Sequence, residues 1–257
     1  MACEKASNAM RDRFPGTDRT GWLFLLACLM LPATTRAEPP DAALPGEGVA
    51  GGRPTPTECV YSTNVWHVGK GTVVDRRTVR KPYDALDPDE RDPNDPRCTV
   101  CEADQVRINP ALLGMGGLPA FRVCHAYAEP VKAALRALAA DPDARIVSIT
   151  GYRPGRTRGP IVGGMRTWFS NHSYGTAIDI NASFNGLYDR CDVLRVTPST
   201  VRKCVLKLGG HWDPRVNPLE TIIEGGAIHR EFTKFWKWGG AIRGGLKDMM
   251  HFSITGH

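Results

Sequence analysis

The residues best suited to chemistry lie in one short stretch, residues 170–179 (SNHSYGTAID). Near its end the pattern alternates, so Ile178 and Ile180 share one face of an expected strand while Asp179 lies on the other. A carboxylate on a half-buried strand is costly unless it is paired or bound to a metal. Gly175 allows the chain to turn back and bring His172 beside Asp179. The stretch therefore predicts two ligands of a metal site.

A third ligand is expected near the end of the chain, where residues 247–254 (KDMMHFSI) place His251 on the polar face of a predicted strand. An open catalytic zinc site uses three protein ligands and leaves one position for water. His172, Asp179 and His251 would supply them. Zinc lowers the pKa of bound water and polarises a carbonyl group. Asp248 is the candidate general base, and Arg153 would hold a substrate carboxylate or the developing oxyanion.

Each of these residues also has a purely structural interpretation. A single histidine near a strand is more often a satisfied structural group than a ligand. Asp179 would then cap a turn, Asp248 would lie on a solvated loop, and Arg153 would pair with an acidic side chain. We assign no role to the remaining histidines, which have no comparable context: His67, His125, His211, His229 and His257.

The segments before the His172 stretch are predicted to be a helix, a strand and a loop. Apolar residues at helical spacing predict a helix over 118–140, kinked or divided at Pro130. Residues 145–150 are expected to form a strand. Residues 155–167 are rich in glycine and arginine and are expected to form a mobile loop.

The segments after it add two helices and complete the expected fold. A capping threonine and a proline at 197–198 predict a helix that ends at the glycine pair 209–210. Residues 219–236 predict a further, interrupted helix. Three short strands carry polar groups on one face, with helices before and between them. We therefore expect an α+β domain with a small, mostly antiparallel sheet and flanking helices.

The first part of the chain is predicted to be removed on export. An apolar run over 21–31 follows several arginines and precedes a small-x-small cleavage pattern that ends at Ala37, as in a secretory signal peptide. An uncleaved anchor and a lipoprotein modified at Cys28 are the alternatives. We expect a secreted or periplasmic protein with no stable membrane insertion after processing.

Beyond Ala37 the sequence predicts a linker, a small element and the main domain. Residues 38–97 are expected to hold the linker and a small disulfide-linked N-terminal element with one or two strands over 59–74, and residues 82–97 a loop. The main domain is expected over 98–257. Six cysteines remain after processing, an even set that argues for disulfides in an exported chain, with 15 possible pairings: Cys59, Cys98, Cys101, Cys124, Cys191 and Cys204. Of these, Cys191 and Cys204 would close a short loop.

Composition narrows the class of partner. Hydrophobic residues make up 42% of the chain and charged residues 23%, which suits a globular protein with a sizeable core. The formal net charge of +6 suits an anionic surface such as a cell wall. No basic run is interleaved with aromatic residues, so we expect no nucleic-acid binding.

Three motifs in order resemble those of one family. Ser170-x-His172-x-x-Gly175-x-Ala177-x-Asp179 resembles the SxHxxGxAxD signature of the M15 metallopeptidases, and residues 151–153 (GYR) resemble the SGYR motif that precedes it. Residues 238–240 (WGG) with Asp248-x-x-His251-Phe252 are similar to the ending of the L-alanyl-D-glutamate endopeptidase branch. The resemblance covers about residues 120–254.

The resemblance implies a Hedgehog/DD-peptidase-like fold and one Zn²⁺ ion. By position, His172, Asp179 and His251 would be its ligands, Asp248 the general base and Arg153 the substrate-binding arginine. The implied substrates are peptidoglycan stem peptides, cleaved beside L-Ala and D-Glu or at a terminal D-Ala, by a monomer. Two other interpretations stay open: a non-catalytic zinc-containing module that binds cell wall or protein, and a disulfide-rich secreted domain without metal.

Overall fold

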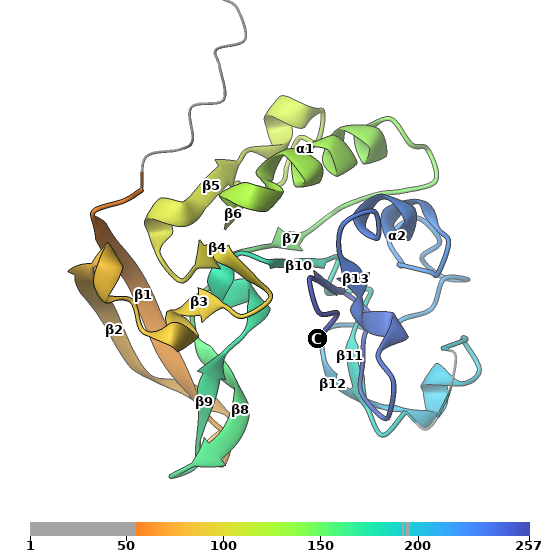
Figure 1. Ribbon diagram of the computed structural model, residues 1–257. Coiled ribbons are helices and arrows are strands. Elements are labelled where there is room, and N and C mark those ends of the chain that lie inside the picture. The colour runs from red at the N-terminus through yellow and green to blue at the C-terminus, as the bar shows by residue number, and fades with distance from the viewer. Residues whose placement is uncertain (1–54, 192, 194–195) are drawn as a thin grey trace, which may run out of the picture. The chain divides into compact units, whose positions relative to one another are not determined.

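Short strands are the main regular elements of the structure, which a computed structural model describes for residues 55–191, 193 and 196–257 (Figure 1). The predicted signal peptide over 1–37 and the linker residues 38–54 lie outside the described residues. The described part is α+β and its strands pair mostly antiparallel, as expected. The Hedgehog-like topology stays a prediction.

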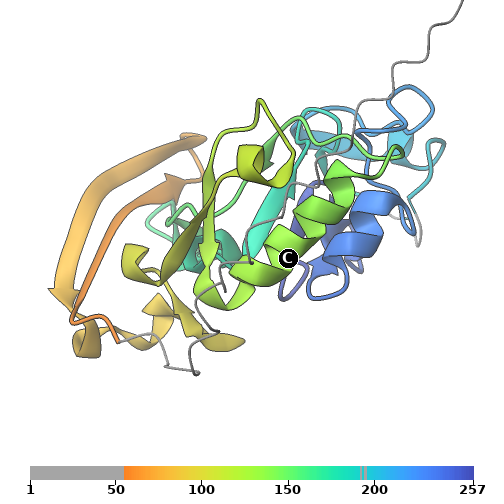
Figure 2. The ribbon, with the colours of Figure 1, turned by 90° about the horizontal axis from the view of Figure 1, so that it is seen from above.

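The sheet that carries the polar strands has four members in the order β13-β15-β10-β7: Lys237–Trp238, His251–Ser253, Ala177–Ile180 and Ile149–Thr150. Its apolar face is covered by helix α1 (His125–Ala139), whose Val131 and Leu135 join Ile178 and Ile180 in one fully buried cluster. The second helix, α2 (Ala227–Phe232), lies beside α1 in both ribbon views (Figures 1 and 2). The period-2 pattern predicted for β10 and β15 is therefore confirmed.

A second four-stranded sheet joins the N-terminal element to the middle of the chain. Its strands lie in the order β2-β1-β8-β9: Thr72–Pro82, Glu58–His67, Arg156–Val162 and Met165–Phe169. The mobile loop predicted over 155–167 is wrong, because this segment forms the β8–β9 hairpin. Its pairing partner β1 lies about ninety residues earlier, with Val65 opposite Arg156 and His67 opposite Met165, so local composition gave no sign of it.

One disulfide holds the N-terminal element, and a second lies next to it. Cys59 bonds to Cys101, and Cys98 bonds to Cys124. These cysteines share a buried cluster with Tyr61, Phe169 and Tyr174. The short loop that the sequence suggested is closed, because Cys191 bonds to Cys204. All six expected cysteines are therefore bonded, while the domain boundary proposed at residue 98 stays a prediction. The segment 82–97 is not only a loop, since it holds β3 (Arg91–Asp92) and the start of β4 (Asp95–Thr99), which pair.

The helix predicted over 118–140 begins later than expected. Residues Phe121–Cys124 form strand β6, which pairs with β5 (Gln105–Ile108), and the helix starts at His125. Phe121 and Val123 are buried while Arg122 is exposed, a strand alternation that the helical spacing concealed. A single helix continues across Pro130.

The helix predicted from 197 to 208 is wrong. That segment holds one 3₁₀ turn, Val201–Lys203, followed by strand β12 (Val205–Leu208). β12 pairs with β11 (Leu187–Asp189), which also pairs with β14 (Lys247–Asp248), so a sheet partner overrode the local capping signal. Two other predictions hold in part, since only Ile149–Thr150 of 145–150 is a strand and only Ala227–Phe232 of 219–236 is α-helix.

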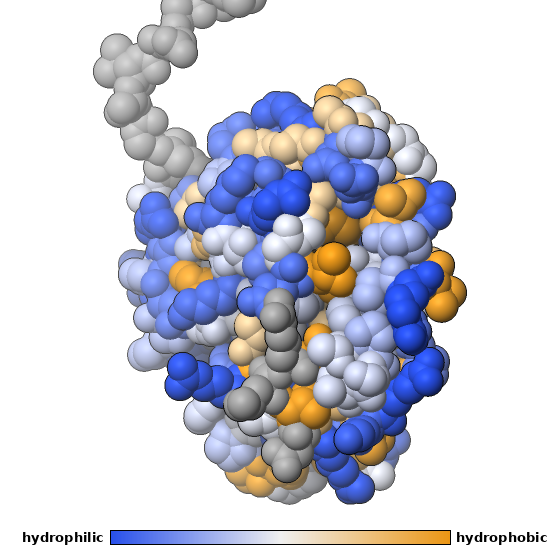
Figure 3. Space-filling view, turned by 90° about the vertical axis from the view of Figure 1, so that its right-hand side faces the viewer, coloured by the Kyte–Doolittle hydropathy of each residue, from blue (hydrophilic) through white to orange (hydrophobic). Residues whose placement is uncertain are grey.

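Further short turns connect these elements. Beyond Val201–Lys203, the 3₁₀ helices of the described residues are Tyr83–Ala85, Pro88–Glu90, Glu102–Asp104, Pro110–Leu113, Asn171–Tyr174 and Gly239–Ala241. No helix in the described part of the chain is both long and apolar enough to cross a membrane. The face drawn in Figure 3 is mostly hydrophilic with separate hydrophobic spots.

Candidate metal centre

Two of the three predicted ligands are direct neighbours across the sheet. Asp179 of β10 pairs with His251 of β15 in the antiparallel register, so their side chains leave the same face. His172 comes from the 3₁₀ turn Asn171–Tyr174, which ends at Gly175 with φ +70°. A Cβ at Gly175 would overlap the side chain of Gln105 and the backbone of Cys124, so only glycine fits this turn.

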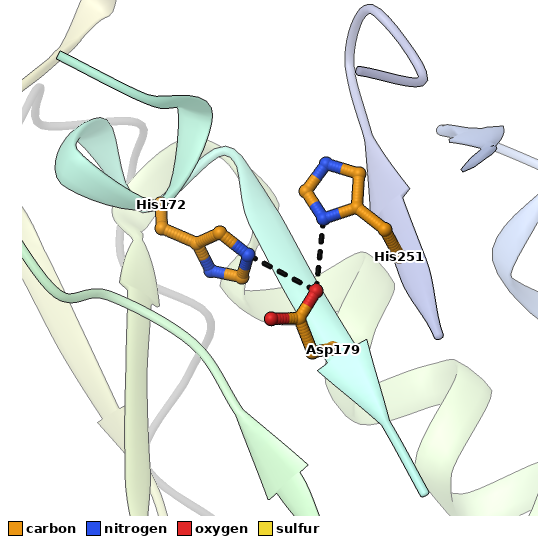
Figure 4. A group of neighbouring side chains, drawn as sticks. All are labelled: His172, Asp179 and His251. Atoms are coloured by element: carbon orange, nitrogen blue, oxygen red, sulfur yellow. Dashed lines mark hydrogen bonds and ion pairs between the residues drawn. The ribbon is translucent and has the colours of Figure 1, made fainter. Parts of the chain in front are cut away.

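The three side chains converge on one carboxylate oxygen (Figure 4). Oδ1 of Asp179 lies 3.1 Å from Nε2 of His172 and 2.9 Å from Nδ1 of His251. The three candidate ligand atoms all lie within 4.8 Å of one another. His172 and His251 are buried, and the Asp179 side chain is 12% exposed. The structure thus brings together all three residues that the sequence singled out.

Backbone carbonyl groups set the orientation of both imidazoles. Nδ1 of His172 lies 2.9 Å from the carbonyl oxygen of Gly151, and Nε2 of His251 lies 3.1 Å from the backbone oxygen of His257. An oxygen of this kind only accepts hydrogen bonds, so each of these nitrogens can donate its proton to it. In neutral rings with these protons, Nε2 of His172 and Nδ1 of His251 would be the nitrogens free to bind a metal ion.

Burial favours this neutral form of His172. Desolvation lowers the pKa of His172, although the nearby Asp179 carboxylate opposes the shift. Desolvation alone would raise the pKa of Asp179, but its contacts with His172 and then His251 hold that pKa well below the usual value. The carboxylate is thus ionised and lies beside two imidazole nitrogens.

A cation between these three atoms would satisfy all of them. Nε2 of His172 is buried and has no hydrogen-bond partner. Two imidazole nitrogens and one carboxylate oxygen form the donor set of an open zinc site, and carbonyl groups that orient the opposite ring nitrogens are typical of such sites. The group therefore fits a divalent metal ion.

Asp248 lies in the same cleft but makes different contacts. It belongs to β14, is only 8% exposed, and its Oδ1 is buried without a hydrogen-bond partner. Desolvation raises the pKa of Asp248 to about 6, while the charge of His251 opposes the shift. A carboxylate with this pKa is ionised at neutral pH and can accept a proton there. The alternative of a solvated loop for Asp248 is therefore wrong.

Arg153 reaches the centre from the loop after β7. Its Nη2 donates a hydrogen bond to Oδ2 of Asp179 over 3.0 Å, and its backbone N–H donates to the carbonyl oxygen of His172. Half of the Arg153 side chain is exposed and lines the cleft. One guanidinium edge is thus committed to Asp179, and the remaining donors are open to a substrate.

The glycine pair after Trp238 has a steric role beside the centre. A Cβ built on Gly239 would lie 2.5 Å from the backbone oxygen of Asp248 and 3.2 Å from Cβ of His251. Trp238 donates its indole N–H to the carbonyl oxygen of Met249. The turn therefore packs directly on the segment that carries Asp248 and His251, which explains why its sequence requires a small residue.

Sequence reasoning missed the walls of the cleft that contains these residues. The cleft has a volume of about 550 Å³. One wall comes from β1 and the β8–β9 hairpin and includes Trp66, Arg158 and Arg166, and the other includes Leu187 and Lys207 of β11 and β12. Only the excess of arginine in 155–167 hinted at this wall. The backbone oxygens that orient the imidazoles were also missed, since backbone groups leave no residue signature.

Comparison with known proteins agrees with this geometry. Residues 163–254 match the model of an M15 peptidase family described as D-alanyl-D-alanine carboxypeptidase. The matched region contains His172, Asp179, Asp248 and His251, and it ends just after β15. Neither the curated proteins nor the solved structures gave a match to the chain.

Proposed function

We propose that this chain, which belongs to the M15 peptidase family, is an exported zinc-dependent hydrolase of peptidoglycan stem peptides. The observation that carries the proposal is the convergence of two imidazole nitrogens and one carboxylate oxygen within 4.8 Å in a cleft. His172, Asp179 and His251 would hold the zinc ion. When bound, zinc would polarise the scissile carbonyl group and lower the pKa of water.

Asp248 is proposed as the general base. Its side chain lines the cleft, and its Oδ1 has no hydrogen-bond partner among the described residues. Asp248 takes a proton from a water molecule as the water attacks the scissile carbonyl carbon. It then gives the proton to the nitrogen of the leaving amine as the C–N bond breaks.

Arg153 is proposed to bind the substrate. Its free guanidinium donors face the cleft and can hold either a substrate carboxylate or the oxyanion that develops on the scissile carbonyl. The description of the matched family favours removal of a terminal D-alanine. The WGG…DxxHF ending instead favours cleavage between L-Ala and D-Glu. Both reactions use the same water, base and arginine.

Export is supported by the cysteines. All three disulfides lie within residues 59–204, and one of them, Cys59–Cys101, ties the N-terminal element to the rest of the described chain. Stable disulfides of this kind are typical of secreted and periplasmic proteins. We expect a monomer in that compartment.

The proposal can be tested with synthetic stem peptides and a matched inactive variant. Purified protein is loaded with zinc, and its metal content is measured before two peptides are added, one ending in D-Ala-D-Ala and one containing L-Ala-D-Glu. We expect cleavage of at least one peptide, loss of cleavage after chelation, and recovery on adding zinc. Asp248→Asn should keep the zinc and lose the cleavage. A zinc-loaded protein that cleaves neither peptide would instead indicate a binding module.

A further inference from the structure

The cleft around the metal centre carries more positive than negative side chains. Its lining includes two carboxylates, Asp179 and Asp248, and four cationic side chains: Arg153, Arg158, Arg166 and Lys207. A divalent ion at the centre would increase this excess. A concave site with one sign of charge attracts ligands of the opposite sign and raises their local concentration. The cleft therefore favours an anionic substrate.

Three of the four cations already have partners in the protein. Arg153 is bonded to Asp179, and Lys207 forms an ion pair of 3.4 Å with Asp189. Arg166 donates a hydrogen bond of 2.6 Å to the carbonyl oxygen of Gly159. Their charges contribute to the field of the cleft, but each has at least one donor in use.

Arg158 differs from the other three. It is half-buried in β8, and it forms no ion pair and no side-chain hydrogen bond with any other described residue. Holding a guanidinium away from bulk water without an acceptor is unfavourable. A planar group with five donors is also well suited to bind a carboxylate with two hydrogen bonds. The cleft thus presents a vacant carboxylate-binding side chain apart from the metal ligands.

We propose that Arg158 is a specificity residue that binds a second carboxylate of the substrate, so that the cleft selects peptides with at least two carboxylates. This inference rests on the proposed function, because it assigns a substrate feature to the same cleft. The first carboxylate is held by Arg153. The β8–β9 hairpin then has a recognition role, and its anchoring to β1 keeps Arg158 in place.

The test compares two stem peptides that differ in one charge. In one peptide, the glutamate carboxylate that is not part of the peptide chain is free. In the other peptide, the same carboxylate is amidated. Binding is measured by calorimetry to zinc-loaded Asp248→Asn protein, and kcat/KM is measured with the wild-type residue at 248. We expect amidation to weaken binding about tenfold, equivalent to about 1.4 kcal/mol.

Arg158→Gln in the same backgrounds identifies the contact. This substitution should weaken binding of the free-acid peptide by about the same factor of ten. Binding of the amidated peptide should stay nearly unchanged. Arg158→Lys should recover part of the preference. Arg136→Gln is the control, because it removes the same charge from an exposed position on α1. It should change the binding of neither peptide.

Several results would overturn this inference. The inference is contradicted if the two peptides bind equally well or if neither binds. It is also contradicted if Arg158→Gln weakens the binding of both peptides by the same factor. Failure of the proposed function gives a different result. If wild-type protein cleaves neither peptide but Arg158 still discriminates between them in calorimetry, the recognition role stands and the peptidase proposal fails.

Discussion

Replacing Asp248 with asparagine should stabilise the metal-free protein while removing its activity. Asp248 is 8% exposed and its Oδ1 has no partner, so asparagine fits the same space without breaking a hydrogen bond. The charged form is what the fold disfavours, since desolvation raises the pKa of Asp248 from 3.8 to about 6. A group whose folded pKa is raised binds protons more strongly in the folded state. Its contribution to stability is therefore lost as pH rises between the two values.

The size of the effect follows from this shift. A change of about 2 pKa units corresponds to about 3 kcal/mol at pH values above 6. The asparagine side chain is never ionised, so the Asp248→Asn variant should be about 3 kcal/mol more stable than wild type at about pH 7.5 and equally stable near pH 3.5. The same substitution should lower kcat by a factor of about 10² to 10⁴ in the zinc-loaded protein.

Urea unfolding of chelator-treated protein between about pH 3.5 and 8 measures the stability difference. Chelation is needed because a bound metal ion would favour the carboxylate and reduce the difference. Asp95→Asn is the matched control. Asp95 is also buried, but hydrogen bonds from Arg97, and then from Tyr127, lower its pKa despite desolvation. That variant should be less stable than wild type at about pH 7.5. No gain for Asp248→Asn, or a gain that does not depend on pH, would refute the reasoning.

Three further substitutions test the metal centre, the disulfides and the turn that packs on the centre. His172→Ala should lose bound zinc, measured by elemental analysis, and should no longer gain thermal stability when zinc is added; an unchanged zinc content would remove His172 from the site. Replacing both Cys98 and Cys124 with alanine removes a disulfide that joins residues 26 positions apart. The free energy of unfolding, measured in urea, should fall by about 3 to 4 kcal/mol. A fall of less than about 1 kcal/mol would contradict this chain-entropy estimate. Gly239→Ala should lower kcat, because its Cβ would lie 2.5 Å from a backbone oxygen of β14; Gly116→Ala, with no atom within 4 Å of its Cβ, should leave kcat unchanged.

The ligand group could be predicted because its signal is local. Asp179 lies in an alternating strand, and Gly175 marks the turn that returns His172 to it. His251 lies in a second alternating strand, which pairs with the first in the antiparallel register. The functional roles of these residues are still proposals, but their proximity followed from side-chain type, strand period and one turn.

The cleft walls could not be predicted, because their structure depends on distant partners. Arg158 lies in a segment whose composition suggested a loop, and it becomes a strand through pairing with β1. The segment from 197 to 208 has a sound helix-capping signal, yet Val205–Leu208 pairs with β11. In both places, long-range strand pairing outweighed local preference. The oxygens that orient His172 and His251 belong to the backbone, which carries no sequence signal.

The most direct test of the central claim is digestion of purified peptidoglycan by the mature protein, with and without a chelator, read by mass spectrometry. We predict that zinc-loaded protein releases defined peptide fragments or free D-alanine, that chelation stops this release, and that zinc restores it. The masses of the products identify the bond that is cleaved. Protein that is shown to carry zinc and leaves the peptidoglycan intact would contradict the account.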